Sequence, residues 1–119
     1  MEKISKNKNH TLVFAEVNKD TFEAIRSGKK KIETRAGSVK YQKVKSGDTL
    51  IMSCAGKEFP KKVKKVRHFK SIPALFKVYT PYEINDKTKS VAEATKVYYG
   101  YSGYKEKIAK FGLFAFELE

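Results

Sequence analysis

Short strand-like runs alternate irregularly with short helical segments along this sequence. The run at residues 11–17, TLVFAEV, is β-rich and almost entirely apolar, which is typical of a buried strand. A second run at 49–54, TLIMSC, follows the turn residues 46–48. The run at 113–119, LFAFELE, alternates, so a strand there would place its two phenylalanines and Leu118 on one face.

Helix signals lie between these runs. Asn18 or Asp20 can cap a short helix that Gly28 would end, and Ser90 and Glu93 form a capping-box pattern that opens a helix to about residue 99. The remaining expected elements are strands at 31–35 and 61–69, a helix at 74–77, a last helix between 102 and 112, and irregular segments at 36–48 and 78–89. In 61–69 the valines recur every three residues, so periodicity alone leaves a helix open there. Strands and helices intermix without βαβ regularity, which favours an α+β fold with a largely antiparallel, barrel-like sheet.

Length and composition limit the domain organisation. A chain of 119 residues forms one compact domain that can bury a core without disulfides or metal. Residues 1–9 are polar and basic and predict a mobile arm, and residues 10–119 form the single domain. Cys54 stands alone, and His10 and His68 lack ligand spacing, so we expect no disulfide, metal site or cofactor. The sequence shows no leader and no apolar segment of membrane length, which predicts a location in the cytoplasm, or in the nucleus of a eukaryotic host. The sequence leaves the oligomeric state open, and a monomer is favoured.

The charge is strongly positive. The chain carries 26 basic and 13 acidic residues, a net charge of +13, and such a field attracts polyanions. Almost all of the basic residues are lysine, since Arg26, Arg35 and Arg67 are the only arginines. Lysine suits phosphate groups, whereas arginine offers a planar fork to bases. The composition predicts contact with the backbone of RNA or another single-stranded nucleic acid; the alternative is a lysine-rich surface that is simply solvated.

The most informative segment is residues 27–38, SGKKKIETRAGS. Strand alternation places Lys31, Glu33 and Arg35 on one face, and Ile32 and Thr34 on the other. Glu33 can hold the guanidinium of Arg35, or a neighbouring ammonium, through charge-assisted hydrogen bonds. Cations held in this way can face a phosphate or a base. The alternative is a solvated strand face, on which such a pair contributes almost nothing to stability.

Residues 28–35, GKKKIETR, resemble the G-x-K-x-x-E-x-R signature of ASCH domains, members of the PUA-like superfamily. The order of the surrounding segments is similar as well. An apolar strand and a helix precede the signature, and Gly47 and Asp48 form a turn after it that leads into a hydrophobic strand. The tyrosine-rich segment that closes with a glycine and a last strand is also similar to the family. The resemblance extends over residues 13–118.

This resemblance implies a PUA-like, mainly antiparallel β-barrel flanked by short helices, with a basic cleft that receives a nucleotide or base of RNA. The signature positions carried over are Gly28, Lys30, Glu33 and Arg35. Gly28 would let the backbone turn tightly, and the other three would line the cleft. The neighbouring Lys29 and Lys31 are candidates for nucleic-acid contact too.

An enzymatic function is the alternative that the resemblance leaves open. Some ASCH proteins hydrolyse N4-acetylcytidine, and ribonuclease activity has been attributed to others. In the amidohydrolase group a threonine occupies the signature's glutamate position, whereas this chain has Glu33 there and Thr34 on the opposite strand face. Lys30 and Glu33 would then act as base and acid. The group's additional acidic residue corresponds to one of three candidates: Glu83, Asp86 or Glu93.

A second basic segment lies at residues 60–70, PKKVKKVRHFK. It can serve as a phosphate-contacting stripe or, in a eukaryotic host, as a nuclear localisation signal, although its interleaved valines favour a strand with a basic outer face. Its candidate contacts are Lys61, Lys62, Lys64, Lys65 and Arg67. Tyr41, among polar neighbours, is a candidate for stacking on a base. The tyrosines at 98, 99, 101 and 104 have the spacing of helix packing, which we favour over stacking.

Overall fold

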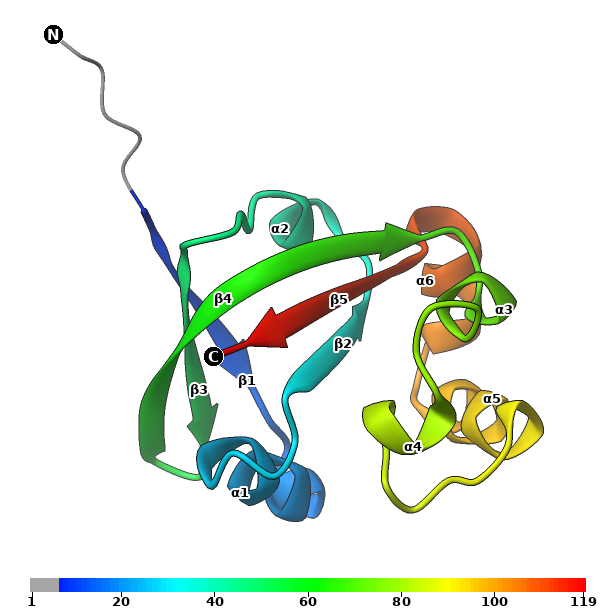
Figure 1. Cartoon of the computed structure of the whole chain (residues 1–119), viewed down its shortest axis with the longest axis horizontal. Coiled ribbons are helices and arrows are strands. Elements are labelled where there is room, and N and C mark those ends of the chain that lie inside the picture. Colours follow the sequence, from blue (N-terminus) through cyan, green and yellow to red (C-terminus); the bar gives the residue numbers. More distant parts are fainter. Residues whose placement is uncertain (1–6) are drawn as a thin grey trace, which may run out of the picture.

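The computed structural model describes residues 7–119 as a curved sheet with one helix in its curve and a group of short helices at one end (Figure 1). The strands are β1 (Asn9–Val13), β2 (Ile32–Ala36), β3 (Thr49–Cys54), β4 (Lys57–Phe69) and β5 (Leu113–Leu118). The helices are the 3-10 turn η1 (Glu16–Asn18), α1 (Lys19–Arg26), α2 (Val39–Gln42), α3 (Ile72–Leu75), α4 (Pro81–Ile84), α5 (Val91–Gly100) and α6 (Tyr104–Phe111).

The five strands form one sheet in the order β1-β3-β4-β5-β2. The β1–β3 pairing is parallel and the other pairings are antiparallel, so the prediction of an α+β fold with mainly antiparallel strands is confirmed. Strand β4 joins the two halves of the sheet, because Lys57–Lys62 pair with β3 and Val63–Phe69 pair with β5. A register shift between Val63 and Lys65 marks the change of partner, where a bulge increases the twist.

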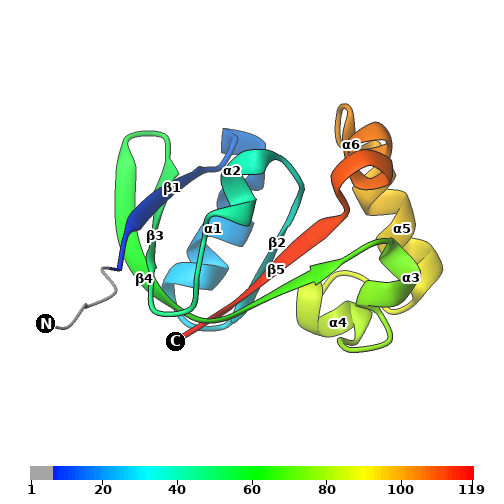
Figure 2. The same ribbon diagram turned by 90° about the horizontal axis from the view of Figure 1, so that it is seen from above.

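The predicted closure of the sheet into a barrel is wrong. Strands β1 and β2 are the two edges, and no ladder joins them within residues 7–119. Helix α1 lies between the β1–β3 side and the β2–β5 side of the sheet (Figure 2). It buries Phe22 and Ile25, which are 1% and 0% exposed, against the inner face of the sheet. Burial of each such side chain stabilises the fold by about 1.5–3 kcal/mol. The packing of α1 therefore stabilises this part of the sheet in place of hydrogen bonds between β1 and β2.

The two faces of the β2–β5 half bury two separate hydrophobic cores. Phe114, Phe116 and Leu118 face the core under α1, as the alternation of their segment predicts. Leu113 and Ala115 face the opposite core, which they share with side chains of α3–α6. The group of short helices is thereby fixed to the back of the sheet, beside strand β2.

Several elements differ from the expected ones. The first strand ends at Val13, because residues 16–18 turn into η1. The basic segment is a strand over Lys57–Phe69, not a helix. Helix α4 lies in the segment expected to be irregular, where Thr80 and Glu83 form a capping box and Pro81 occupies the first turn. These start signals are present in the sequence, and the helix is a single turn long.

The start of β1 is tied to the turn before β3. The Asp48 carboxylate is buried and accepts hydrogen bonds from the backbone N–H of Lys8 at 3.0 Å and of Lys45 at 2.9 Å. His10 Nε2 lies 2.8 Å from the same carboxylate. Asn9 belongs to β1, so the arm expected over residues 1–9 ends before Asn9. Residues 1–6 lie outside the described residues.

Candidate functional site

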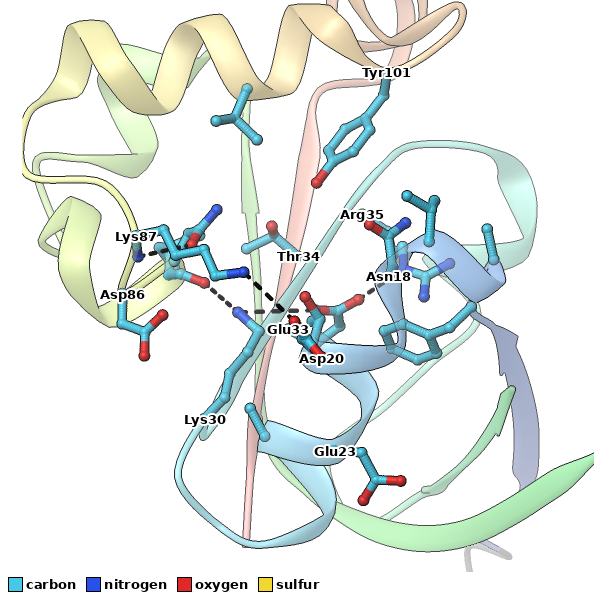
Figure 3. A pocket seen from close by; sticks show the side chains of 18 of the residues that line it. Asn18, Asp20, Glu23, Lys30, Glu33, Thr34, Arg35, Asp86, Lys87 and Tyr101 are labelled. Carbon is cyan, nitrogen blue, oxygen red and sulfur yellow. Dashed lines mark hydrogen bonds and ion pairs between the residues drawn. The ribbon is translucent and has the colours of Figure 1, made fainter. Parts of the chain in front are cut away.

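A cleft of about 860 Å³ opens between α1 and the group of short helices (Figure 3). Strand β2 forms its floor, η1 and α1 form one wall, and α4, α5 and the segment between them form the other. Its size is typical of sites for small molecules and cofactors. The cleft lies where the sheet stays open, because the edge strand β2 has no strand partner on this side within residues 7–119.

Three charged side chains lie together at the floor. Arg35 Nε donates a hydrogen bond of 2.9 Å to Glu33 Oε2. Lys30 Nζ lies 3.9 Å from the other carboxylate oxygen, Glu33 Oε1. The side chains of Lys30, Glu33 and Arg35 are 14%, 8% and 15% exposed, so water screens these interactions poorly. The predicted pairing of Glu33 with Arg35 is confirmed.

Arg35 is fixed from three sides. Besides its bond to Glu33, its guanidinium donates to the backbone oxygen of Val13 at 3.2 Å and lies over the Phe14 ring, 4.6 Å from the centroid. Burial acts to lower the pKa of Arg35, but the charge and hydrogen bond of Glu33 outweigh it and raise the pKa. The side chain thus bridges the two open edges of the sheet as a permanent cation.

Lys30 reaches the opposite wall. Its ammonium donates a hydrogen bond to the backbone oxygen of Ile84 at the end of α4. Burial lowers the pKa of Lys30, and the nearby carboxylates of Glu33 and Asp86 counteract only part of this effect. Lys30 therefore joins the floor to the far wall and gives up its proton more readily than a surface lysine.

The cleft lining taken from residues 7–119 carries as many carboxylates as cations. The carboxylates are Asp20, Glu23, Glu33, Glu83 and Asp86, and the cations are Arg26, Lys29, Lys30, Arg35 and Lys87. Two ion pairs cross between the walls, Lys29 with Asp86 at 3.5 Å and Lys87 with Asp20 at 3.8 Å. The net charge of +13 therefore arises outside the cleft. The cleft expected to be basic is balanced in charge.

The upper parts of the walls are apolar and aromatic. Val17 is 88% exposed, Tyr101 is 40% exposed, and both line the cleft. Tyr98 lies deeper, and its hydroxyl lies 2.5 Å from the Thr34 hydroxyl on the floor. Burial raises the pKa of Tyr98 well above its ordinary value, so the phenol stays protonated. A charged floor beside apolar and aromatic wall residues fits a planar group with a polar edge.

Solved structures with the same fold show where this chain belongs. A crystal structure of the hypothetical protein PH0355 matches over 96% of this chain and 98% of its own, with 30% identity and a TM-score of 0.75. The chain belongs to the family of PH0355. The solution NMR structure of PF0455 from Pyrococcus furiosus matches over 93% of this chain and 96% of its own, with 28% identity and a TM-score of 0.68. No family model and no curated protein matches the chain.

In this member of the PH0355 family, the cleft brings together part of the residue set that the sequence predicts. Lys29, Lys30, Glu33 and Arg35 line it, whereas Lys31 is exposed and lies outside the lining. The lining also excludes the stacking candidate Tyr41 and the basic residues of β4, which are Lys61, Lys62, Lys64, Lys65 and Arg67. Tyr41 packs against the core beside Phe116, and Arg67 lies 3.3 Å from Glu117.

Phe14 and Asn18 line the cleft although no motif marks them as site residues, and they reach it from the ends of β1 and η1. Tyr101 lines it from the end of α5 and is 40% exposed, although its spacing favours helix packing over stacking. Of the three acidic candidates, Glu83 and Asp86 line the cleft and Glu93 does not; the Glu93 side chain accepts the backbone N–H of Lys89. Only the packing of α4 and α5 against β2 could identify these residues.

The described residues hold neither a metal-binding cluster nor a membrane-spanning helix. Among residues 7–119, no three His, Cys, Asp or Glu side chains are grouped so that they could hold a metal ion. Over the same range, no helix combines the length and the hydropathy needed to cross a membrane.

Proposed function

We propose that this protein binds RNA and receives one of its bases in the cleft. The observation that carries the proposal is the set of Lys30, Glu33 and Arg35, three nearly buried charged groups that fix one another at the floor of a cleft of about 860 Å³. Buried charges cost free energy unless they are paired, and such groups in a concave site are typical of ligand recognition. A base matches the balanced charge of this cleft better than a phosphate does.

The resemblance to ASCH domains supports the proposal. The signature residues Lys30, Glu33 and Arg35 all line the cleft. Gly28 has φ +86°, a left-handed conformation that favours glycine, and it turns the chain from α1 towards β2. A PUA-like domain with this signature would present the same side chains to a nucleotide.

Stacking surfaces are available on one wall and on the floor. Tyr101 extends over the cleft from the end of α5 (Figure 3). Arg35 presents a guanidinium plane that the Phe14 ring supports. Aromatic rings and arginine planes are the groups on which proteins stack unpaired RNA bases. An unpaired base is therefore the RNA element that we expect to enter.

Phosphate contacts would lie outside the cleft, on the basic outer side of β4. Two further segments join β4 there: Thr49, which pairs with Lys62, donates its backbone N–H to the oxygen of Lys8, and the Ser46 hydroxyl donates to the backbone oxygen of Lys64. The β4 residues Lys61, Lys62, Lys64 and Lys65 are called the basic stripe. The stripe supplies the attraction to the RNA backbone that the balanced cleft lacks.

Salt dependence of binding tests this division. Binding of a short single-stranded RNA should weaken with salt, with a logarithmic slope of about −0.7 for each phosphate neutralised. Replacing the four stripe lysines Lys61, Lys62, Lys64 and Lys65 by serine should reduce the slope by about 0.7 for each contact that is removed. A matched control replaces four exposed lysines on the helical side: Lys77, Lys89, Lys96 and Lys107. Equal slopes for both variants would show that the stripe is not part of the interface. If the protein binds RNA no more tightly than it binds a neutral polymer, the proposed function is wrong.

A second candidate is a hydrolase that acts on a modified nucleoside or on RNA. The observation that favours it is the lowered pKa of Lys30, since a lysine that gives up its proton readily can act as a general base. Glu33 lies beside it as the acidic partner. Asp86, which also acts on the Lys30 ammonium, is the best placed of the additional carboxylates.

Turnover assays separate the two candidates. The wild-type protein is incubated with N4-acetylcytidine and, separately, with labelled RNA, and the products are analysed by chromatography. Hydrolysis that is lost in Lys30→Ala and kept in Lys77→Ala, which changes an exposed lysine outside the cleft lining, supports the enzyme. Absence of turnover by the wild type, or equal turnover by Lys30→Ala, removes it and leaves binding.

A further inference from the structure

We infer that Glu33 Oε1 is the atom that reads the base: it accepts an N–H of the ligand, while the adjacent Lys30 ammonium donates to a neighbouring acceptor atom. This inference rests on the proposed function and names its specificity-determining residue. It also names the ligand class, a nucleobase that presents an N–H beside an acceptor on the same edge.

The two oxygens of Glu33 have different surroundings. Oε2 accepts the hydrogen bond from Arg35, whereas Oε1 lies 3.9 Å from Lys30 Nζ, beyond hydrogen-bond distance. Among the described residues, none donates a hydrogen bond to Oε1. No fully buried side-chain oxygen or nitrogen of residues 7–119 lacks a partner, so Oε1 must reach the open space of the cleft. A carboxylate oxygen that is accessible only from the cleft is a strong acceptor for a donor group of a ligand that enters there.

The surroundings of Glu33 hold this oxygen in place. Arg35 fixes the carboxylate plane and is itself held by Val13 and Phe14. Lys30 is held by the Ile84 carbonyl and keeps further N–H groups for a ligand. The floor therefore presents an acceptor next to a donor without rearrangement, which lowers the entropic cost of binding.

The same geometry disfavours an anion at the floor. At neutral pH the oxygens of a phosphate group act almost entirely as acceptors, so they cannot satisfy Oε1, which is itself an acceptor. The negative charge of the phosphate would also lie directly against that of Oε1. Lys30 and Arg35 together exceed the charge of Glu33 by only one positive charge, whereas a phosphate monoester carries about −1.5 to −2 at pH 7, so the two cations cannot neutralise both groups. A nucleotide therefore enters with its base towards Glu33 and its phosphate towards the exposed rim cations, Lys29 and Lys87.

The test compares nucleosides with forms in which methyl groups replace the N–H hydrogens of the base edge, with wild-type protein and isothermal titration calorimetry. The parents are uridine, cytidine and adenosine, and their blocked forms are 3-methyluridine, N4,N4-dimethylcytidine and N6,N6-dimethyladenosine. A parent that binds should lose at least about tenfold in affinity when its N–H is blocked, because the ligand then covers Oε1 without donating to it. The controls 5-methyluridine and 5-methylcytidine add a methyl group and keep the donor, and they should bind within about threefold of their parents.

The outcomes separate this inference from the proposed function. Parents and blocked forms that bind equally would overturn the role of Glu33 and leave base binding intact. Displacement of a bound nucleoside by inorganic phosphate would overturn it as well. If neither nucleosides nor RNA bind, the proposed function itself fails. All of these measurements use the wild-type chain, so they do not depend on a variant that folds.

A variant pair adds a second line of evidence. Glu33→Gln keeps the shape of the side chain and removes its charge, whereas Glu106→Gln removes a charge from an exposed position of α6 outside the cleft lining. Glu33→Gln should lower the affinity for the parent nucleoside at least about tenfold and should shrink the difference between parent and blocked form. Glu106→Gln should change neither quantity. A folded Glu33→Gln protein that keeps the full discrimination would overturn the inference.

Discussion

Replacing Asp48 by asparagine tests whether the start of β1 is held by a buried carboxylate. The Asp48 side chain is 5% exposed. Its Oδ1 accepts the Lys8 N–H at 3.0 Å, and its Oδ2 accepts the Lys45 N–H at 2.9 Å with His10 Nε2 at 2.8 Å. Asparagine has almost the same shape but carries an NH2 group in place of one of the two oxygens. Either orientation of the amide turns a donor towards at least one backbone N–H.

The cost follows from these contacts. A hydrogen bond to a charged group contributes about 1.5–3 kcal/mol, and a buried N–H without an acceptor costs a similar amount. Asparagine keeps one acceptor oxygen, so we expect the free energy of unfolding to fall by about 2–3 kcal/mol at neutral pH. With a urea m-value of about 1.5 kcal/mol/M, the unfolding midpoint should fall by about 1.3–2 M.

The pH dependence has a definite sign. Burial acts to raise the pKa of Asp48, but the hydrogen bonds from Lys8, Lys45 and His10 outweigh it and lower the pKa. A group whose pKa is lower in the folded state stabilises the fold above its unfolded pKa of about 3.9. This contribution is lost as the pH falls through the folded-state pKa. The difference in stability between wild type and Asp48→Asn should therefore narrow below about pH 4.

Urea unfolding followed by circular dichroism, from neutral pH to about pH 3, measures both effects, since the chain has no tryptophan for fluorescence. The control is Asp86→Asn, which removes a partly exposed carboxylate paired with Lys29 and should change stability by less than about 1 kcal/mol. If Asp48→Asn unfolds at the same midpoint as this control, the three contacts do not hold β1. A difference that stays constant into the acid range would refute the assignment to the charge.

Further predictions concern backbone fit and buried hydroxyls. Gly112→Ala should destabilise the fold by at least about 2 kcal/mol in thermal unfolding, because Gly112 has φ +79° and an added Cβ would lie 2.3 Å from the backbone oxygen of Phe69. Gly100→Ala, where no atom lies within 4 Å of the new Cβ, should be neutral or stabilising by up to about 1 kcal/mol, and equal losses at both positions would contradict the explanation. Tyr98→Phe should lower the free energy of unfolding in urea by about 1 kcal/mol, because the Thr34 hydroxyl loses its partner. Adding Thr34→Val should recover part of that loss. If the effects of the two substitutions are purely additive, the two hydroxyls do not interact.

Local geometry explains which parts of the site the sequence could predict. Side chains two apart on a strand share a face, so the pairing of Glu33 with Arg35 follows from the chain itself. The same alternation predicts that Phe114 and Phe116 point into one core. Gly28 ends α1 with a positive φ, as a glycine after a helix is expected to do. These features depend on a few neighbouring residues.

The open edge of the sheet could not be predicted in the same way. Alternation and turn residues specify the strands, but they do not specify whether β1 pairs with β2. In the structure these two strands are the edges of the sheet, and α1 separates them along the chain. Closure depends on whether the helix packs outside the sheet or inside its curve, and burial of Phe22 and Ile25 favours the inside. The energy of that choice is distributed over the whole core, so no local pattern carries it.

The sequence alone determined the strands, most of the helices, the pairing of Glu33 with Arg35 and a strong positive charge, because propensity, alternation and composition act over short distances along the chain. Tertiary structure decided that Lys30 meets Ile84, 54 residues away, and that Tyr101 and Asp86 face the same cleft. It also decided that the cleft is balanced in charge while the excess of lysine lies elsewhere. Both outcomes depend on how the short helices dock on β2, and the burial of many side chains at once fixes that docking.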